Sequence, residues 1–361
     1  MKVLILTASY GSGHVIAAKG LTEAFQEKGV EPVVFDLVIE GGKTERNAAA
    51  FYEFLMKRGH FVWKLYHDRI MPINKGNSIR KIYTLLHRKK FFKEIEEINP
   101  DIIVSTMDVA SLIGSLYKKG HSDVKIFTVL TDYVAHPIWV WQNMDGYFVG
   151  SQETKEYLVN HGIAAEKISI SGIPLRFQFE KKMTQKEARE KLGIPQDKRV
   201  ILISAGSFKS VPVESIVHAL SPRHDVYAVI LAGSKNANVS TFADFLNYFR
   251  VEGKVLEYTD EMETFMTASD LYISKAGGLT VAECLSRGLP AVYINNFPGH
   301  EAGNAAYTSK NGAAVVAGRN NIKEVLDEVL GDRLELMKNH AEELGKPHAS
   351  GEIVESILRT S

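Results

Sequence analysis

Short apolar runs rich in β-branched residues alternate with helical patterns along most of the chain. The run Val-Ile-Leu-Ile at 200–203 has no polar position, which is typical of a strand buried on both faces. Strands of this kind that alternate with helices predict parallel sheets built from βα units. The predicted strands are 2–9, 31–38, 101–107, 124–131, 146–150 and 168–171 in the first half, and 200–205, 226–232, 254–258, 271–274, 291–295 and 313–316 in the second.

The two halves meet at 172–176, where glycine and proline interrupt the pattern before a charged helix begins. The length of 361 residues suits two domains. We therefore predict an α/β protein with two doubly wound, Rossmann-like domains that face a cleft. The N-terminal domain is expected at 1–172 and the C-terminal domain at 173–345, with a last helix at about 346–361 that packs back on the first domain. Ligands of such sheets bind beyond the carboxyl ends of the strands, so function is expected in the loops that follow them.

Composition and charge exclude several classes of protein. Lys+Arg and Asp+Glu both number 43, so no overall charge indicates a nucleic-acid partner. The single cysteine, Cys284, excludes an internal disulfide, fits a reducing compartment and lies in an apolar helical pattern typical of a buried thiol. No segment approaches the roughly 20 apolar residues that span a bilayer. The expected location is the cytoplasm, with any membrane contact peripheral.

The first strand leads into a Gly-Ser-Gly-His turn, formed by Gly11, Ser12, Gly13 and His14. Two glycines allow a tight turn, and the start of the following helix favours an anion. The pattern is not the dinucleotide fingerprint, because Ile16 stands where that motif has glycine. His14 is a candidate general base, although a helix cap or an exposed histidine would look the same without further context.

A second polar cluster, 131–139, follows another strand of the same sheet. Asp132 could orient a base or hold an acceptor hydroxyl, and Trp139 could offer a stacking surface. For His136 and Trp139 individually, an ordinary loop with a packed tryptophan is an equal alternative.

Three loops of the second half follow strands and suit a nucleotide-sugar. Small residues at 204–207 and the start of a helix at 277–280 could offer backbone amides to phosphates. Glu283 lies one helical turn further on and could accept both ribose hydroxyls. The third loop brings an imidazole, an acid and an amide together. The candidate donor-binding residues are Gly206, Ser207, Gly277, Gly278, Thr280, Glu283, His300, Glu301 and Asn304.

The order of these motifs resembles glycosyltransferase family 28. The motifs are Gly-x-Gly-His, Thr-Asp-x-x-x-His-x-x-Trp, Gly-Gly-x-Thr-x-x-Glu and Pro-Gly-x-Glu-x-x-Asn, and the resemblance extends from Lys2 to about Leu344. Within the family, the chain is most similar to the diacylglycerol β-glucosyltransferases and the monogalactosyldiacylglycerol synthases. It is a more distant relative of the peptidoglycan N-acetylglucosaminyltransferases. The resemblance implies a GT-B fold, an inverting mechanism and a C-terminal domain that holds a UDP-sugar.

The resemblance also implies roles for individual residues. His14 matches the proposed catalytic base, and Asp132 matches an acidic residue near the reaction centre. Glu283 matches the ribose-binding glutamate. Glu301 and Asn304 match contacts to the donor sugar. The phosphate-facing turns are matched by Gly206, Gly277 and Gly278. The loop that shapes the acceptor and diphosphate site is matched by Gly11 and Gly13. His300 departs from the family, which commonly has glutamine there, and this departure leaves the identity of the hexose open. Glucose is expected over galactose.

A basic stretch at 57–93 contains eleven Lys or Arg residues and one acid, Asp68. Aromatic and aliphatic residues interleave with these cations, which suits an anionic membrane surface, where each cation contributes about 1 kcal/mol. A solvated charged face is the alternative, and no nucleic-acid motif accompanies the stretch. The candidate membrane-binding residues are Trp63, Lys64, Arg80, Lys81, Arg88, Lys89 and Lys90.

The sequence thus predicts a UDP-sugar:diacylglycerol glycosyltransferase, peripheral at the inner face of the cell membrane and processive if it accepts its own glycolipid product. No cofactor beyond the UDP-sugar substrate is expected, and no Asp-x-Asp motif suggests a metal. Three alternatives stay open: transfer to another lipid-linked acceptor such as a peptidoglycan precursor, a UDP-sugar epimerase, and a non-catalytic UDP-sugar sensor.

Overall fold

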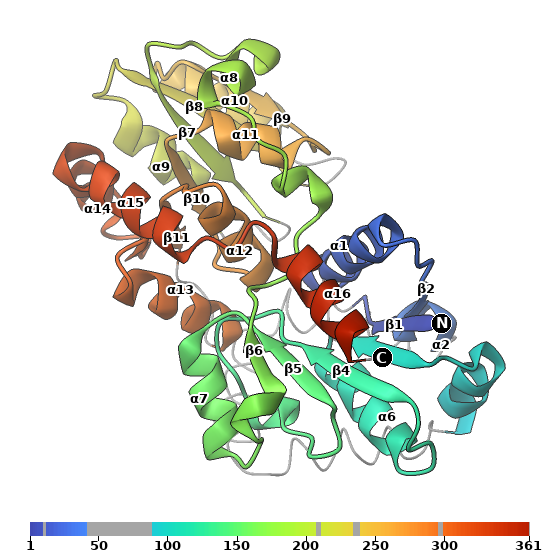
Figure 1. Cartoon of the computed structure of the whole chain (residues 1–361). Helices are drawn as coiled ribbons and strands as arrows, with labels where there is room; N and C mark the ends of the chain where they lie inside the picture. The colour runs from blue at the N-terminus through green and yellow to red at the C-terminus, as the bar shows by residue number, and fades with distance from the viewer. Residues whose placement is uncertain (10–11, 42–88, 207–210, 234–238, 295–298, 361) are drawn as a thin grey trace. The chain divides into compact units, whose positions relative to one another are not determined.

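The computed structural model describes residues 1–9, 12–41, 89–206, 211–233, 239–294 and 299–360 (Figure 1). The chain forms two compact units: Met1–Phe177 together with His348–Ser361, and Gln178–Pro347. Each unit contains a six-stranded sheet whose described strand pairs are all parallel. The prediction of an α/β protein with two doubly wound sheets is confirmed, and every predicted strand is present.

The first sheet has the strand order β2-β1-β3-β4-β5-β6. Along β1, Val3 and Ile5 belong to the core on one face of the sheet, and Leu4 and Leu6 belong to the core on the other. Burial on both faces explains why this strand is a continuous apolar run in the sequence. The strands are β1 (Val3–Thr7), β2 (Val33–Asp36), β3 (Ile102–Ser105), β4 (Lys125–Val129), β5 (Gly146–Val149) and β6 (Ile168–Ile170).

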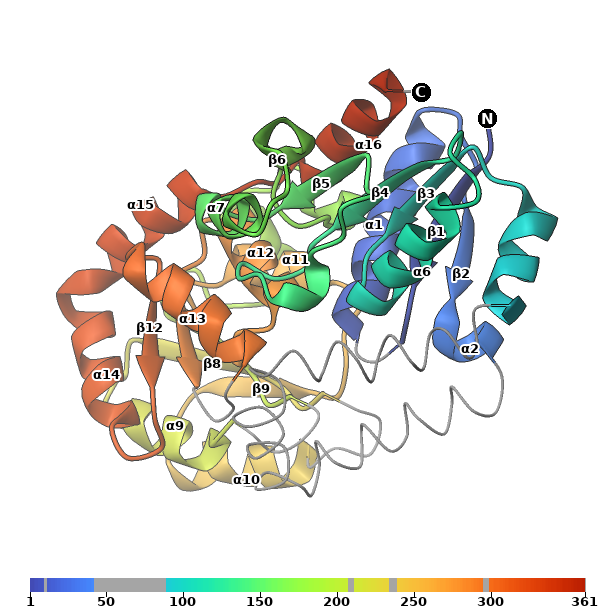
Figure 2. The ribbon, with the colours of Figure 1, turned by 90° about the horizontal axis from the view of Figure 1, so that it is seen from below.

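Helices cover both faces of this sheet. On one face, α1 (Ser12–Glu27) and α16 (Ala349–Arg359) lie side by side in both views (Figures 1 and 2). On the other face, α6 (Asp108–Lys118) and the helical residues 89–98 contribute to the core. The other elements of the unit are α2 (Leu37–Gly41), α7 (Gln152–Asn160) and the 3₁₀ turns η2 (Pro137–Trp139) and η3 (Ala165–Lys167), and a further turn, η4 (Phe177–Phe179), leads into the second unit.

The C-terminal helix α16 is fastened to the first unit through the main chain at Leu175. The Ser350 hydroxyl donates to the Leu175 carbonyl at 2.6 Å and accepts from the Leu175 amide at 3.0 Å. On the other side of this segment, a Cβ at Gly20 of α1 would lie 2.4 Å from the Leu175 carbonyl oxygen. Gly20 therefore permits a close approach that a side chain would prevent.

The second sheet has the order β12-β11-β10-β7-β8-β9. Ile201 and Ile203 of β7 pack in the same core as α9 and α14, while Val200 and Leu202 are buried on the opposite face. The strands are β7 (Arg199–Ser204), β8 (Val226–Leu231), β9 (Gly253–Leu256), β10 (Leu271–Ser274), β11 (Ala291–Ile294) and β12 (Ala314–Ala317).

The helices of the second unit again lie on both faces, and α13 and α14 flank β12 (Figure 2). They are α8 (Gln185–Leu192), α9 (Val213–Leu220), α10 (Val239–Tyr248), α11 (Met262–Ala268), α12 (Gly278–Ser286), α13 (His300–Lys310), α14 (Ile322–Glu328) and α15 (Leu334–Leu344), with a π turn at Val329–Arg333.

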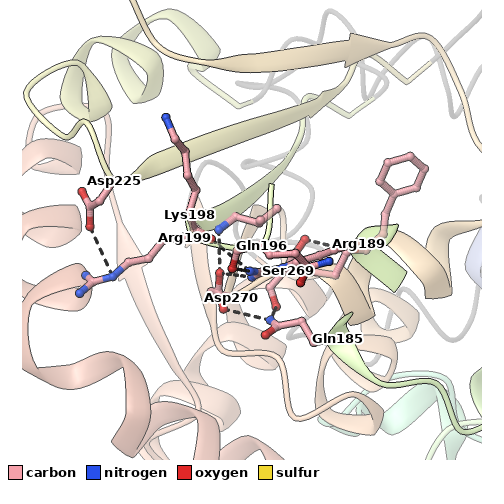
Figure 3. A network of polar contacts seen from close by, with 11 residues as sticks. Gln185, Arg189, Gln196, Lys198, Arg199, Asp225, Ser269 and Asp270 are labelled. Carbon is pink, nitrogen blue, oxygen red and sulfur yellow. Dashed lines mark hydrogen bonds and ion pairs between the residues drawn. The ribbon is translucent and has the colours of Figure 1, made fainter. Parts of the chain in front are cut away.

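A buried arginine ties α8 to the amino ends of two central strands (Figure 3). The Arg189 guanidinium donates to the carboxylate of Asp270 at 2.7 Å and to the carbonyls of Ala268, Gln196 and Lys198 at 2.9–3.2 Å. The same Asp270 oxygen accepts from the Val200 amide at 2.6 Å, so one ion pair links α8, β7 and β10. Each guanidinium nitrogen has at least one acceptor, which is the condition for a buried charge to hold a structure together.

This network predicts a large loss of stability when the guanidinium is removed. Arg189→Met keeps the chain length but leaves Asp270 and three carbonyls without their partner, so the free energy of unfolding should fall by about 3–5 kcal/mol. Urea unfolding followed by circular dichroism measures the change. The matched control is Lys186→Met on the same helix, whose lysine is 76% exposed and pairs with Glu190 at 3.9 Å. Equal unfolding midpoints for the two variants would contradict the role of Arg189.

Candidate active site

The order of the strands selects one point on each sheet where loops diverge. In the first sheet, β2 lies on one side of β1 and β3 lies on the other, so the order of the strands reverses between β1 and β3. In the second sheet, the order reverses in the same way between β7 and β10. At such switch points, the loops beyond the carboxyl ends turn to opposite faces and leave room for a ligand. The residues that follow β1, β3, β7 and β10 are therefore the candidates for chemistry.

His14 lies at the first of these points, in the first turn of α1. Its Nδ1 atom is 3.0 Å from the Thr106 carbonyl oxygen and 2.8 Å from the Thr131 hydroxyl oxygen. Thr106 directly follows β3, and Thr131 comes soon after β4. The segments that follow β1, β3 and β4 therefore meet at the His14 imidazole, at the carboxyl ends of these strands.

The turn that carries His14 is fixed at both ends. At its start, the Asp36 carboxylate accepts hydrogen bonds from the Ser9 amide at 3.2 Å and from the Ser9 hydroxyl, and it also accepts from the Val38 amide at 2.9 Å. At its end, the Thr106 hydroxyl contacts the Thr7 hydroxyl at 2.9 Å and the His14 carbonyl at 3.2 Å. Gly11 lies outside the described residues, while Ser12 and Gly13 begin α1.

The cluster 131–139 contributes less to the site than expected. Asp132 is half-buried in the loop next to Thr131. The His136 ring accepts a hydrogen bond from the Ile138 amide at 3.4 Å and so caps η2. Trp139 is 2% exposed and packs in the core, which favours the packed tryptophan of the two alternatives given above. Its apolar neighbours on the sheet supply the reason, since burial of the indole there removes more apolar area from water.

At the switch point of the second sheet, two contacts join α13 to the turn that follows β10. The Lys275 ammonium pairs with the Glu301 carboxylate at 2.6 Å, and the Asn304 amide donates to the Ala276 carbonyl at 3.1 Å. Asn304 is 0% exposed in this arrangement, and its expected contact with the donor sugar stays a prediction. His300, the first residue of α13, is half-buried.

The start of α12 lies at the same edge. Gly277 precedes its first residue, Gly278, while Thr280 is half-buried and Glu283 is 7% exposed one turn further on. Burial raises the pKa of the adjacent Cys284 thiol, and the Glu283 carboxylate raises it further. The thiol is therefore neutral and buried, as the sequence indicates, and is no nucleophile.

Glycines also shape the turns after β7 and β8. Gly206 has φ +69° and Gly233 has φ +104°, a region that favours glycine. A Cβ at Gly233 would lie 3.3 Å from the Gly206 carbonyl oxygen, so the two turns approach closely. Ser207 lies outside the described residues.

A cavity of about 580 Å³ lies at the opposite edge of the second sheet. Its lining includes Ser269 and Asp270, which precede β10, and Leu289 and Pro290, which precede β11. It is therefore at the amino ends of the strands, away from the edge where parallel sheets bind nucleotides.

The basic stretch is described only from residue 89 onward, so Trp63, Lys64, Arg80, Lys81 and Arg88 lie outside the described residues. In the described part, Lys89 and Lys90 are exposed, whereas Phe91 and Ile95 are buried in the core. No helix among the described residues is long and apolar enough to cross a membrane. Within the same residues, no group of three or more His, Cys, Asp or Glu side chains could hold a metal ion.

Four residues at the carboxyl ends of the strands of the two sheets are not among the candidate residues taken from the sequence: Asp36, Thr106, Thr131 and Lys275. Each is a polar residue that ends a strand or follows one within two residues. That position is the signal that could have identified them, because it brings side chains to one edge of the sheet whatever motif they belong to.

Two Rossmann-like units with polar residues at both switch points define a GT-B glycosyltransferase fold. Solved structures support this class: MurG of Acinetobacter baumannii has a TM-score of 0.67 at 15% identity, with 99% of each chain covered. The UDP-GlcNAc 2-epimerase of Neisseria meningitidis, bound to UDP-GlcNAc, has a TM-score of 0.64 at 16% identity, covering 99% of this chain and 100% of that one.

The sequence comparisons define the family. Residues 14–175 match the monogalactosyldiacylglycerol (MGDG) synthase family model, and residues 200–357 match the glycosyltransferase family 28 C-terminal domain. Processive diacylglycerol beta-glucosyltransferases of Bacillus pumilus and Bacillus subtilis are each 30% identical, over 100% of this chain and 95% of their own length. The chain belongs to glycosyltransferase family 28 and is a glycosyltransferase, as its motifs indicate.

Proposed function

We propose that this enzyme transfers a hexose, with glucose favoured, from a UDP-sugar to the hydroxyl of diacylglycerol and forms a β-glycolipid. The observation that carries the proposal is the imidazole of His14, fixed at the switch point of the first sheet by groups from β3 and β4. The full-length similarity to diacylglycerol beta-glucosyltransferases supports the acceptor. Processive addition of a second sugar would need the first glycolipid to serve as acceptor.

In the proposed reaction, His14 takes the proton of the acceptor hydroxyl as the new bond forms. The hydroxyl oxygen attacks the anomeric carbon from the side opposite UDP, the bond to the UDP oxygen breaks, and the configuration inverts. UDP leaves with the bonding electron pair, and the proton stays on the imidazole until solvent removes it. Asp132 directly follows Thr131 in the sequence. Its carboxylate would act on the same hydroxyl or on the imidazolium.

The donor is proposed to lie at the carboxyl edge of the second sheet. The turns at Gly206 and Gly277–Gly278 and the start of α12 would offer amides and a positive helix end to the diphosphate. Glu283 would accept the ribose hydroxyls, and His300 and Glu301 would contact the hexose. Lys275, already paired with Glu301, would offset the charge that develops on the leaving UDP.

The first prediction concerns the base. His14→Ala should reduce transfer by about 10²–10⁴-fold, the usual cost of losing a general base. UDP affinity should change little, because the donor residues belong to the other unit. The assay incubates the enzyme with diacylglycerol vesicles and UDP-glucose, UDP-galactose or UDP-N-acetylglucosamine, and identifies the lipids formed by mass spectrometry.

Two results of this assay would overturn the proposal. Retention of most of the wild-type kcat by His14→Ala would exclude the histidine as base. Failure of the wild-type enzyme to glycosylate diacylglycerol with any donor, while it binds UDP, would favour a sensor. Activity only on a peptidoglycan lipid precursor would instead identify another lipid-linked acceptor.

The second prediction separates nucleotide contacts from sugar contacts. Glu283→Ala removes a charged acceptor whose hydrogen bonds are each worth about 1.5–3 kcal/mol, so the Kd for UDP should rise at least tenfold. His300→Gln is the matched control, because it changes a residue proposed to contact the hexose and leaves the Lys275–Glu301 pair in place. Calorimetry should therefore show normal UDP affinity for His300→Gln and weakened UDP affinity for Glu283→Ala. Unchanged UDP binding by Glu283→Ala would refute the ribose contact.

The third prediction concerns the membrane surface. Replacement of Arg88, Lys89 and Lys90 by glutamate should weaken binding to anionic vesicles, and wild-type binding should fall as salt rises, because exposed charges are screened beyond about 10 Å at 0.1 M. Activity on a short-chain acceptor dispersed in detergent should survive. Vesicle flotation measures the binding.

A control variant distinguishes local docking from net charge. Lys19, Lys28 and Lys119 are exposed residues of the same unit, and their replacement by glutamate changes the total charge by the same amount. This control should keep nearly all vesicle binding. If both triple variants bind alike, the basic stretch is only a solvated face.

A further inference from the structure

The surroundings of the His14 ring determine which nitrogen carries the proton. The Thr106 carbonyl oxygen is 3.0 Å from Nδ1, and a carbonyl oxygen can only accept a hydrogen bond. Nδ1 must therefore carry a hydrogen, because a bare lone pair would face the oxygen lone pairs at that distance. In the neutral ring, the basic lone pair is then on Nε2.

The Thr131 hydroxyl is the second oxygen at this nitrogen. Its Oγ1 atom is 2.8 Å from Nδ1, and since Nδ1 is the donor, this oxygen accepts from the same N–H. Thr131 is 4% exposed, so the contact is shielded from competing water. The carbonyl of Thr106 and the hydroxyl of Thr131 thus hold the ring from two neighbouring strand ends.

We propose that Thr131 is a positioning residue that, with the Thr106 carbonyl, holds His14 in the Nδ1–H tautomer and presents Nε2 to the acceptor hydroxyl. The inference rests on the proposed function only in taking His14 as the base. When Nε2 gains the acceptor proton, the ring becomes a cation with two N–H groups. Its Nδ1–H already points at two oxygens, so the ring need not rotate as its charge develops.

The side chains of Thr106 and Thr131 have different partners, which makes the proposal testable. The Thr106 hydroxyl contacts Thr7 and the His14 main chain, so its removal would disturb the turn. The Thr131 hydroxyl contacts the imidazole itself. A change at Thr131 should therefore act on the chemical step through the ring.

The test compares Thr131→Val, which keeps the shape and removes the hydroxyl, with Thr131→Ser, which keeps the hydroxyl. Thr131→Val should lower kcat by on the order of tenfold, the effect on the rate that corresponds to one lost hydrogen bond. The KM for UDP-sugar should stay the same, and Thr131→Ser should restore most of kcat. Equal kcat for wild type and Thr131→Val, or equal losses in both variants, would overturn the proposal.

The control is Thr128→Val, three residues earlier in β4. The Thr128 hydroxyl is buried and contacts Ser105 and Ser111 at 3.2 Å, so this variant also loses buried hydrogen bonds. It should lower the melting temperature without lowering kcat. If Thr128→Val lowers kcat as much as Thr131→Val does, the effect is one of general stability and the positioning role is wrong.

A spectroscopic measurement separates this inference from the proposed function. In ¹⁵N-histidine-labelled enzyme, the His14→Ala spectrum assigns the His14 signals among the 12 histidines. The wild-type ring should show the Nδ1–H tautomer without any substrate, and Thr131→Val should shift its ¹⁵N signals, because the Nδ1–H then has one acceptor in place of two. An Nε2–H ring in the wild type would overturn the proposal even if diacylglycerol is glycosylated. An Nδ1–H ring sensitive to Thr131 would uphold it even if the acceptor proves different.

Discussion

The structure depends on the burial of parallel strands on both faces. The middle of β1 and of β7 is buried on both faces, so residues 3–6 and 200–203 are apolar without interruption. Polar chemistry is thereby confined to the two ends of the strands. The helices that connect parallel strands also cover both faces of the sheet, so a ligand can reach the sheet at the ends of its strands.

Polar residues at the amino ends and at the carboxyl ends of the strands of the second sheet have different surroundings. At the amino ends, the Arg189 side chain is 6% exposed and is held by three carbonyls and by Asp270, which is 24% exposed, and these contacts join helix and strands (Figure 3). At the carboxyl ends, the Lys275 side chain is 22% exposed where it pairs with Glu301, which is 29% exposed. A cation that keeps contact with solvent can exchange its partner for a ligand at small cost, whereas a buried cation that loses its partners is left as an isolated charge. The burial of the cation is therefore what distinguishes the structural pair from the candidate binding pair.

The strands and the switch-point loops could be predicted because they depend on local pattern. Each apolar run is long enough to identify a strand, and glycine-rich turns follow several of them. The burial of Trp139 and Asn304 could not be predicted in this way. A tryptophan in a polar loop and an asparagine near the start of a helix look accessible in sequence, and their burial depends on which distant core or turn they meet. In the same way, Thr131 lies 117 residues from His14, and no local pattern relates the two.

The environment of His14 follows from the same constraint. Parallel strands in register bring the residues that follow β1, β3 and β4 to one level, and the register pairs Leu6 with Ser105 and Ser105 with Thr128. Thr106, one residue beyond Ser105, and Thr131, three residues beyond Thr128, lie past the ends of these paired strands and reach the first turn of α1. The Asp36 carboxylate, at the end of β2, holds the near side of that turn. An imidazole so placed is oriented by one main-chain carbonyl and one side-chain hydroxyl at the carboxyl ends of neighbouring strands, so in the proposed reaction it needs no rearrangement before it accepts a proton.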